Sequence, residues 1–304
     1  MVIIMNEDYK IIYIKKKDKI RKIITYNNLE KRKQHQFIYN KINKSFKPSI
    51  YSKGYIKNEA IYTNVIPHLY NNYFFKTDIE DFFKNINHKK LIDLLYNEIK
   101  NIASPNDCYK IVKQCSYSKK GLPLGFITSP LLANVYLKRF DISLYSKLRK
   151  LNCKNIIYTR YADDIMISFK ETSEDIGIIR NEIEKIISDY LKKYYLKINK
   201  KKTKFIVFAK THQVRLTGIT IVEKNSMRRI SVGRNQKRKF FYDVINKCKT
   251  DTKISEIEVK RIKGKMSFYL SIEKECFEDF ITKNMKIEIE KLGYNSLIEL
   301  INSL

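Results

Sequence analysis

The chain has 304 residues, and its 61 Lys and Arg against 32 Asp and Glu give a formal net charge of +29. Its composition is 43% hydrophobic and 12% aromatic, with charges interleaved along the chain, which excludes a basic disordered tail and indicates a folded protein. A fully solvated basic surface would need no partner. A positive charge of this size more often neutralises phosphates, so nucleic acid is the expected partner.

The cysteines and apolar stretches indicate a cytoplasmic protein that does not contact a membrane. The longest apolar stretches, such as residues 205–209, have the length of a strand, and the first ten residues lack a basic start before an extended apolar region. The cysteines are odd in number and form no CxxC pair, so we expect reduced thiols rather than disulfides or zinc ligands. They are Cys108, Cys115, Cys153, Cys248 and Cys276.

Two strand-forming regions are expected early in the chain. Residues 10–25 contain two apolar runs around a KKKDK turn, which predicts a β-hairpin. Residues 73–79 form a β-prone run that contains Asp78 near its end, and residues 80–87 indicate a turn into a helix. The hairpin is basic and can reach phosphate groups through Lys15, Lys16, Lys17, Lys19 and Arg21.

The middle of the chain predicts a long helix and a second hairpin. Ser129 followed by Pro130 is typical of an N-cap and first helical residue, so the helix should begin at Pro130. Residues 156–169 contain two β-rich arms that flank the acids Asp163 and Asp164. We expect these two acids at the tip of the hairpin.

The later elements complete an α+β pattern. Ser173 is expected to cap an amphipathic helix whose apolar residues recur at helical spacing between Ile176 and Tyr194. A strand over residues 205–208 follows, and the chain from Arg234 onward is helical and basic. The order strand, helix, hairpin, helix, strand predicts a mostly antiparallel sheet with helices on one side.

Three acids are candidates for a metal site. A tight hairpin tip can direct Asp163 and Asp164 at one point, and Asp78 ends a strand that could lie beside that hairpin. Carboxylates suit Mg²⁺, and two such ions can stabilise both the attacking and the leaving oxygen in phosphoryl displacement. The carbonyl of Ile79 could complete the coordination. Taken singly, an Asp in a hairpin turn or before a helix is usually an ordinary turn or cap residue.

Four segments carry a family resemblance. They are FFKTDIEDFFKNIN (74–87), GLPLGFITSPLLAN (121–134), IYTRYADDIMISF (157–169) and LKINKKKTKF (196–205). In this order they resemble the palm motifs of reverse transcriptases, which implies an α+β right-hand polymerase with fingers, a palm of antiparallel sheet plus helices, and a small helical thumb. The resemblance implies fingers in 1–70 continuing into 88–120, a palm in 71–87 and 121–222, and a thumb and RNA-binding region in 223–304.

The same resemblance implies roles for the acidic residues and one lysine. Asp78, Asp163 and Asp164 match the metal-binding triad of the family, which implies two Mg²⁺ ions, with Mn²⁺ as a possible substitute. Lys202 matches a lysine that protonates the leaving pyrophosphate, although Lys200 and Lys201 beside it leave the register open.

Nucleotide contacts are implied at four positions. Arg21 matches a fingers arginine that holds the triphosphate. Phe83 matches the bulky residue that blocks a ribonucleotide 2′-OH, although a core Phe beside Phe82 is the simpler alternative. Leu124 stands where most relatives have Gln before Gly125, and an apolar side chain cannot donate the hydrogen bond that Gln would make to the nucleotide.

Two smaller signals resemble bacterial retron reverse transcriptases. The segment NVIPH (64–68) is similar to their NAxxH element, and LTG (216–218) is similar to their VTG. Alone, NxxxH could be an ordinary turn. Residues 227–239 resemble the region that holds a structured RNA in retron enzymes. The RNA-binding residues implied by this resemblance are Asn64, His68, Thr217, Gly218, Arg228, Arg229, Arg234, Lys237 and Arg238.

The expected activity is RNA-templated DNA synthesis from dNTPs. By resemblance to retrons, one noncoding RNA would serve as template and primer, and a 2′-OH would start a branched RNA-DNA product (msDNA) in an anti-phage system with a separate effector protein. The alternatives are another bacterial defence-associated or group II intron-like reverse transcriptase, and a catalytically silent RNA-binding scaffold.

Overall fold

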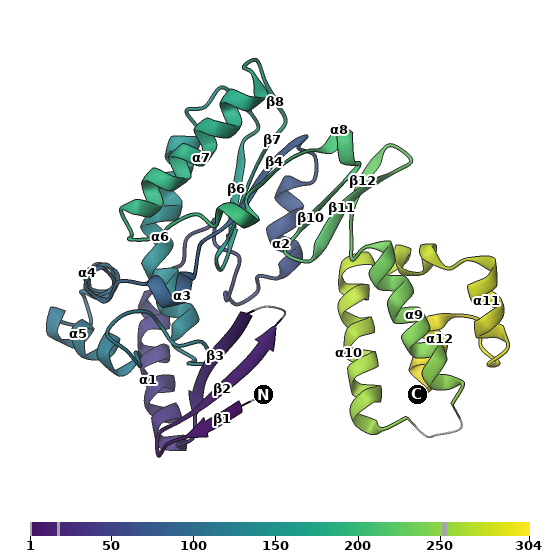
Figure 1. The fold of residues 1–304 in the computed structure, drawn as a ribbon, viewed down its shortest axis with the longest axis horizontal. Coiled ribbons are helices and arrows are strands. Elements are labelled where there is room, and N and C mark those ends of the chain that lie inside the picture. The colour runs from purple at the N-terminus through teal and green to yellow at the C-terminus, as the bar shows by residue number, and fades with distance from the viewer. Residues whose placement is uncertain (1, 17–18, 251–253) are drawn as a thin grey trace. The chain divides into compact units, whose positions relative to one another are not determined.

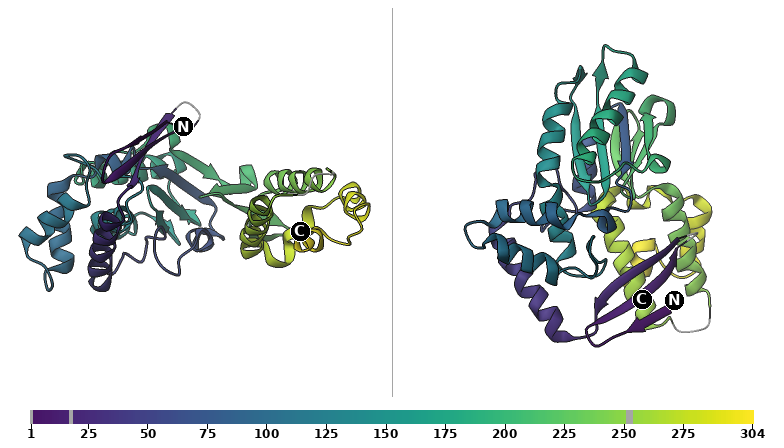
Figure 2. Two further views of the ribbon diagram at one scale, coloured as in Figure 1. Left: turned by 90° about the horizontal axis from the view of Figure 1, so that it is seen from below. Right: turned by 60° about the vertical axis from the view of Figure 1, so that its left-hand side comes forward.

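The chain folds into two compact units in the computed structural model, which describes residues 2–16, 19–250 and 254–304. The first unit comprises the chain up to Asn64 together with Tyr70–Lys210. The second comprises Val65–Leu69 and Thr211–Leu304. Figures 1 and 2 show both units.

The first unit begins with a three-stranded antiparallel sheet in the order β1-β2-β3. Its strands are β1 (Val2–Met5), β2 (Tyr9–Lys16) and β3 (Lys19–Tyr26). The basic hairpin expected over residues 10–25 is confirmed, with Arg21 opposite Ile14. Lys17 of the expected basic cluster lies outside the described residues.

A four-stranded sheet forms the centre of the first unit. Its order is β6-β7-β4-β9, and every neighbouring pair is antiparallel, as expected for an α+β fold. The expected strand before Asp78 and the hairpin around the two acids are therefore both present. The strands are β4 (Tyr73–Asp78), β6 (Ile157–Tyr161), β7 (Asp164–Phe169) and β9 (Lys204–Val207).

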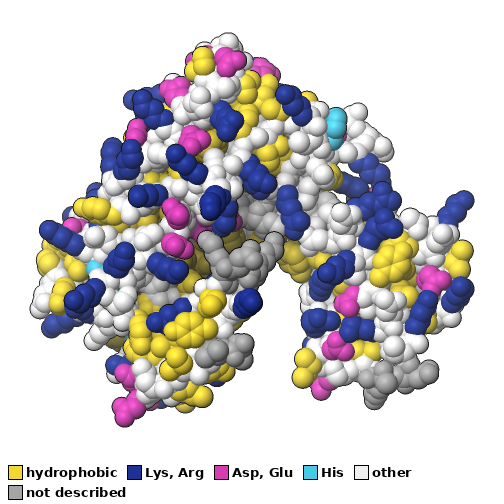
Figure 3. Space-filling model, viewed as in Figure 1, with side chains coloured by type: hydrophobic (Ala, Val, Ile, Leu, Met, Phe, Trp, Pro, Cys, Tyr) yellow, Lys and Arg dark blue, Asp and Glu magenta, His cyan; other side chains and the backbone are white. Residues whose placement is uncertain are grey.

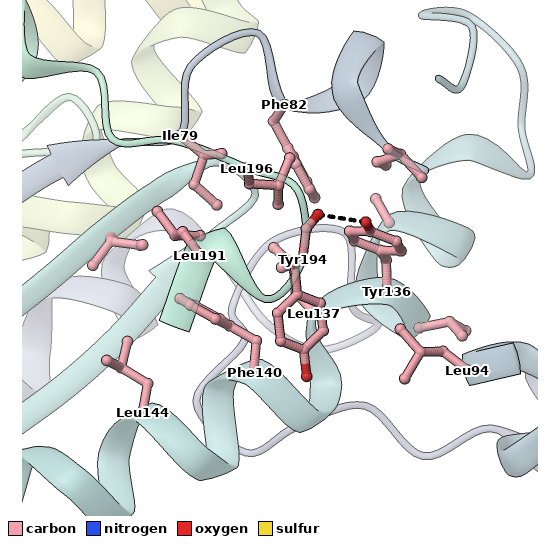
Figure 4. Packing of buried hydrophobic residues seen from close by; sticks show 14 of the residues in the cluster. Ile79, Phe82, Leu94, Tyr136, Leu137, Phe140, Leu144, Leu191, Tyr194 and Leu196 are labelled. Atoms are coloured by element: carbon pink, nitrogen blue, oxygen red, sulfur yellow. Dashed lines mark hydrogen bonds between the residues drawn. The ribbon is translucent and has the colours of Figure 1, made fainter. Parts of the chain in front are cut away.

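Two long helices, α6 (Ser129–Leu148) and α7 (Ile176–Lys192), pack against one face of this sheet. Phe75 of β4 and Ile167 of β7 are cross-strand partners on that face, and both are completely buried in the main core. Within the core, the Tyr136 hydroxyl of α6 donates a 2.6 Å hydrogen bond to the carbonyl of Tyr194, just after α7 (Figure 4). The sheet and the two helices therefore share one hydrophobic core.

Both long helices start differently from the sequence prediction. Helix α6 begins at Ser129, and its N-cap is Thr128. The buried Ser129 hydroxyl instead donates to the carbonyl of Pro123 at 2.7 Å. Helix α7 is capped by Asp175, whose carboxylate accepts from two backbone amides of the first turn, and Ser173 lies outside the helix. Thr128 makes no side-chain capping hydrogen bond, whereas the capping of α7 by Asp175 is a local contact two and three residues along the chain.

The remaining elements of the first unit are helices and short strands around the central sheet. They are α1 (Leu29–Ser45), α3 (Phe82–Asn85), α4 (His88–Ile99), α5 (Pro105–Gln114), β5 (Cys153–Lys154), β8 (Glu171–Thr172), the 3₁₀ helix η2 (Lys200–Lys202) and α8 (Phe208–Thr211). The segment that joins the two units contains α2 (Ile61–Val65) and the 3₁₀ helix η1 (Ile66–His68).

The second unit combines a small antiparallel sheet with helices. The basic helical region expected from Arg234 is present, whereas the sheet was not expected. The strands are β10 (Gln213–Leu216), β11 (Ile219–Lys224) and β12 (Met227–Ser231). The helices are α9 (Arg234–Cys248), α10 (Glu256–Glu273), η3 (Lys274–Phe280), α11 (Lys283–Glu290) and α12 (Leu297–Ser303).

The surface is basic, and the cysteines whose side chains are described are free. Figure 3 shows Lys and Arg side chains spread over the visible face of both units. No helix in the described part of the chain is long and apolar enough to cross a membrane. The side chain of Cys276 lies outside the described residues, and the free thiols are Cys108, Cys115, Cys153 and Cys248.

Candidate active site

Three carboxylates meet where two neighbouring strands end. Asp78, the last residue of β4, is the cross-strand partner of Asp164, the first residue of β7. Asp163 precedes β7 in a tight turn whose first residue, Ala162, has a left-handed φ of 57°. The amide of Ile79 donates to the Asp163 carbonyl at 3.0 Å, which fastens the chain after Asp78 to the hairpin tip. The structure therefore brings the three predicted acids together.

The carboxylates repel one another electrostatically. Burial, followed by the charges of Asp78 and Asp164, raises the pKa of Asp163 to about 6. Burial and the charge of Asp78 also raise the pKa of Asp164. A cluster of like charges in a partly desolvated site favours binding of a cation, which would restore the ionised forms.

Lys202 is the lysine of the KKK run that faces the carboxylates. Its ammonium group donates to Asp78 Oδ2 at 2.7 Å. Burial alone would lower the pKa of Lys202, but the hydrogen bond to Asp78 and the charges of Asp163 and Asp164 raise it overall. The ammonium group is therefore held in its charged form.

Asn199 is a second partner of Asp78 that the sequence did not indicate. Its side-chain amide donates to Asp78 Oδ1 at 3.0 Å, and its backbone amide donates to the Asp78 carbonyl at 2.8 Å. The Asp78 carboxylate thus has a fixed orientation. The sequence signal was only the position of Asn199 just before the three lysines.

The donor set is suited to hard divalent cations, although it is not a preformed cage. Among the described residues, no three or more His, Cys, Asp and Glu side chains already surround one point closely enough to form a metal site. Asp78 and Asp164 nevertheless lie on adjacent paired strand ends, with Asp163 next to them, and all three offer carboxylate oxygens.

A buried arginine holds the turn between β6 and β7 in place through hydrogen bonds. Arg160 of β6 is completely buried, and its Nε and Nη2 bind the two oxygens of Asp141 at 2.7 and 2.8 Å. Its Nη1 donates to the Ala162 carbonyl at 2.8 Å. The Tyr158 hydroxyl also donates to Asp141 Oδ1, at 2.7 Å. The turn that carries Asp163 is therefore anchored to helix α6.

The segment 51–54 contacts the same turn and the end of β6 through its backbone. The Arg160 amide donates to the Tyr51 carbonyl at 2.8 Å, and the Lys53 amide donates to the Arg160 carbonyl at 2.7 Å. A Cβ atom at Gly54 would lie only 2.6 Å from the Ala162 amide nitrogen. Only glycine permits this approach of two backbones. No sequence motif pointed to this segment.

The residues expected to contact the nucleotide lie in the first unit. Phe83 is half-buried and packs against Phe82 and the main core. Gly125 has a φ of 111°, and a Cβ there would lie 2.5 Å from the Ile24 carbonyl oxygen. The half-buried Leu124 accepts from the Ile24 amide at 2.8 Å. The loop that contains Leu124 and Gly125 is thus docked on β3, the strand that carries the exposed Arg21.

The residues of the two retron-like signals occupy different environments. Asn64 and His68 are buried, and complete burial lowers the pKa of His68 to about 3, which leaves it neutral at physiological pH. Thr217 and Gly218 have φ values of 44° and 96° and form the two-residue turn between β10 and β11. Such a turn needs positive φ at both central residues, so its chemistry is also that of an ordinary tight hairpin.

The basic residues expected to bind RNA are partly engaged within the second unit. Arg228 pairs with Glu223 at 3.3 Å, and Arg229 pairs with Asp279 at 3.2 Å. Lys237 is buried and donates to Glu273 at 2.6 Å, which does not support the expected contact with RNA. The side chains that remain exposed are those of Arg234 and Arg238 on α9.

Comparison with known proteins defines the class to which this fold and site belong. A family model described as "Reverse transcriptase (RNA-dependent DNA polymerase)" matches residues 6–221. The chain therefore belongs to the reverse transcriptase family, and it is an RNA-directed DNA polymerase by class.

Two curated relatives confirm the resemblance to retron enzymes. The Retron Ec86 reverse transcriptase of Escherichia coli is 28% identical over 291 residues, which cover 95% of this chain and 84% of the relative. The Retron Ec73 reverse transcriptase of Escherichia coli is 33% identical over 147 residues, with coverages of 41% and 46%. This chain thus spans most of one relative and under half of the other.

A solved structure supports the right-hand polymerase fold. Telomerase from Candida albicans, in a complex with a TWJ fragment of telomeric RNA, aligns with a TM-score of 0.55 and 12% sequence identity. The alignment covers 97% of this chain and 60% of the telomerase chain. At this identity the likeness concerns the fold alone.

Proposed function

We propose that this protein is a retron reverse transcriptase that copies a cognate structured noncoding RNA into DNA. The observation that carries the polymerase chemistry is the meeting of Asp78 with Asp163 and Asp164 at two paired strand ends. The similarity to Retron Ec86 reverse transcriptase along 95% of the chain favours the retron branch. The RNA would act as template and primer, and an RNA 2′-OH would start a branched RNA-DNA product.

In the proposed reaction, a primer hydroxyl attacks the α-phosphorus of a dNTP and pyrophosphate leaves. Asp78, Asp163, Asp164 and the Ile79 carbonyl would hold two Mg²⁺ ions, or Mn²⁺ as a substitute, which supply charge stabilisation to the attacking and leaving oxygens. Lys202 is held protonated beside Asp78 and can donate its proton to the leaving pyrophosphate.

The nucleotide would be recognised by side chains of the first unit. Arg21 is exposed on β3 and would hold the triphosphate, while Phe83 would exclude a 2′-OH. Leu124 cannot donate a hydrogen bond, so the loop would guide the nucleotide through Gly125 and its backbone. Replacement of Phe83 by Ala should increase ribonucleotide incorporation, and an unchanged preference for dNTPs would contradict the steric role.

The domain and partner assignments follow from the same proposal. Fingers would occupy 1–70 and 88–120, the palm 71–87 and 121–222, and the thumb and RNA-binding region 223–304, with Arg234 and Arg238 toward the RNA. The compact units divide the chain at Lys210, inside the proposed palm. A separate effector protein would complete an anti-phage system in the cytoplasm.

Two experiments test the proposal at separate levels. Purified protein should extend a primed RNA template with dNTPs and Mg²⁺, and the double variant Asp163→Asn, Asp164→Asn should not; equal activity would refute the metal assignment. Nucleic acid copurified from cells that express the native locus should contain a small RNA joined to DNA through a 2′,5′ linkage. Polymerase activity without that product would favour the alternative, another bacterial defence-associated or group II intron-like enzyme.

A further inference from the structure

Tyr55 is an exposed aromatic residue in a strained backbone conformation beside the carboxylates. Its side chain is 53% exposed, and its φ of 62° lies in the left-handed region that bulky residues rarely adopt. Its ring lies 6.4 Å from that of Phe83 at 82° and 6.5 Å from that of Tyr161 at 39°. Strained residues persist where the surroundings over-determine them, and they cluster at ligand sites.

The backbone before Tyr55 is fixed against the catalytic turn. Gly54 approaches the Ala162 amide so closely that no Cβ would fit, and the Lys53 amide binds the Arg160 carbonyl. Arg160 in turn holds the Ala162 carbonyl. The position of the Tyr55 ring is therefore coupled to the position of the turn that carries Asp163.

The hydroxyl of Tyr55 lies within the fields of two groups assigned to the reaction. Partial burial raises the pKa of Tyr55, the charge of Asp163 raises it further, and the charge of Arg21 acts in the opposite direction. The raised pKa keeps the hydroxyl protonated.

We propose that Tyr55 contacts the incoming deoxynucleoside triphosphate, with its exposed ring, Phe83 and Tyr161 forming an aromatic wall against the sugar and base. This inference rests on the proposed polymerase function and adds a nucleotide-binding residue to it. An aromatic ring can stack on any base, so the contact contributes affinity for all four dNTPs without selecting among them.

The test is steady-state extension of a primed RNA template by wild-type protein and by Tyr55→Ala and Tyr55→Phe. Tyr55→Ala should raise KM for each of the four dNTPs by about tenfold with a smaller change in kcat, because base–aromatic stacking is commonly worth about this factor. Tyr55→Phe keeps the ring and should stay within about threefold of wild type. The matched control is Tyr109→Ala on α5, whose side chain is 49% exposed and which should leave KM unchanged.

Three results would overturn the inference. The first is an unchanged KM in Tyr55→Ala while the Asp163→Asn, Asp164→Asn variant is inactive, which would leave the polymerase proposal standing. The second is a Tyr55→Ala variant that binds the primed template more weakly but has an unchanged KM for dNTPs. This result would mean that Tyr55 contacts the template and not the nucleotide. The third is a wild-type protein that extends no primer, which would remove both proposals together. If Tyr55→Ala does not fold by circular dichroism, Tyr55→Leu provides a bulky side chain without a ring and should show the same rise in KM.

Discussion

The ammonium group of Lys202 and the carboxylate of Asp78 are joined by a hydrogen bond of 2.7 Å. Lys202 is therefore already at the carboxylate cluster before any substrate binds, and it partly offsets the repulsion among the acids. In the proposed reaction Asp78 would hold a divalent cation, and Lys202 beside it would be placed to act as the proton donor.

Replacement of Lys202 by Gln should lower kcat by about a hundredfold and change the KM for dNTP much less, because the proposed role of the lost group is to protonate the leaving pyrophosphate. Single-turnover primer extension measures this effect directly. Lys200→Gln and Lys201→Gln are the matched controls, since Lys202 is the lysine of this run that contacts Asp78 in the described structure. An equal loss in either control would show that the three lysines act through their general charge.

Activity and stability should respond to pH through Asp163, whose pKa is raised to about 6. The folded state holds this proton more tightly than the unfolded state, so the contribution to stability is present below about pH 4 and is lost as the pH rises through 6. In metal-free protein, Asp163→Asn should therefore be more stable than wild type at pH 7.5, on the order of 1–2 kcal/mol, with the difference vanishing near pH 4.

Urea unfolding in the presence of a chelator, at pH 4 and pH 7.5, measures this difference. Because a bound cation would offset the repulsion among the ionised carboxylates, added Mg²⁺ should stabilise the wild-type protein at pH 7.5 and have little effect on Asp163→Asn. If the difference in unfolding free energy between Asp163→Asn and wild type is the same at pH 4 and pH 7.5, the charge of Asp163 does not destabilise the folded protein.

Breaking the buried pair of Arg160 and Asp141 should destabilise the fold strongly. Arg160→Met leaves the Asp141 charge buried without its partner and should cost about 3–5 kcal/mol of unfolding free energy. The double variant Arg160→Met, Asp141→Leu removes both charges and should recover much of that loss.

Denaturant unfolding of the two single variants and the double variant gives the coupling energy between Arg160 and Asp141. The exposed pair of Lys154 and Glu171, at 3.3 Å, provides the control, and Lys154→Ala should cost less than about 1 kcal/mol. If the loss of unfolding free energy in the double variant equals the sum of the losses in the two single variants, Arg160 and Asp141 do not stabilise each other.

Substitution of Gly54 by Ala should impair activity more than stability. The new Cβ would meet the Ala162 amide at 2.6 Å, so the hairpin turn or the segment before Tyr55 must shift. A shift of a few tenths of an ångström at the catalytic acids should reduce primer extension by at least about tenfold.

Gly264→Ala on α10 is the control for Gly54→Ala, because a Cβ at Gly264 meets no atom within 4 Å. This substitution should stabilise the protein by about 0.5–1 kcal/mol through helix propensity and leave activity unchanged. Full activity in Gly54→Ala would indicate that the turn tolerates movement.

The sequence allowed a correct prediction of the elements that depend on local patterns. The hairpin around Asp163 and Asp164 and the strand that ends at Asp78 follow from β-rich runs and turn residues, and their pairing follows from the resemblance of the motifs. The supporting contacts could not be predicted in this way. Arg160 and Asp141 are joined by chain packing, and segment 51–54 is recognisable only through its approach to Ala162.

The basic residues show a second limit of sequence patterns. Lys237 lies in a run of basic residues that is typical of RNA binding, yet its ammonium group is buried against Glu273 of another helix. Composition counts such a residue as surface charge. Only the tertiary structure reveals which cations are neutralised inside the protein.

The ion pair of Lys237 and Glu273 also organises the start of α9. The other oxygen of Glu273 accepts from the Val232 amide at 2.7 Å and from the Ser231 hydroxyl at 2.8 Å, so one carboxylate joins β12, α9 and α10. Buried cations release no condensed counterions from a nucleic acid when it binds. The ionic-strength dependence of RNA affinity should therefore report only the exposed cations, and the count of 61 Lys and Arg overstates the number of side chains that can neutralise phosphates.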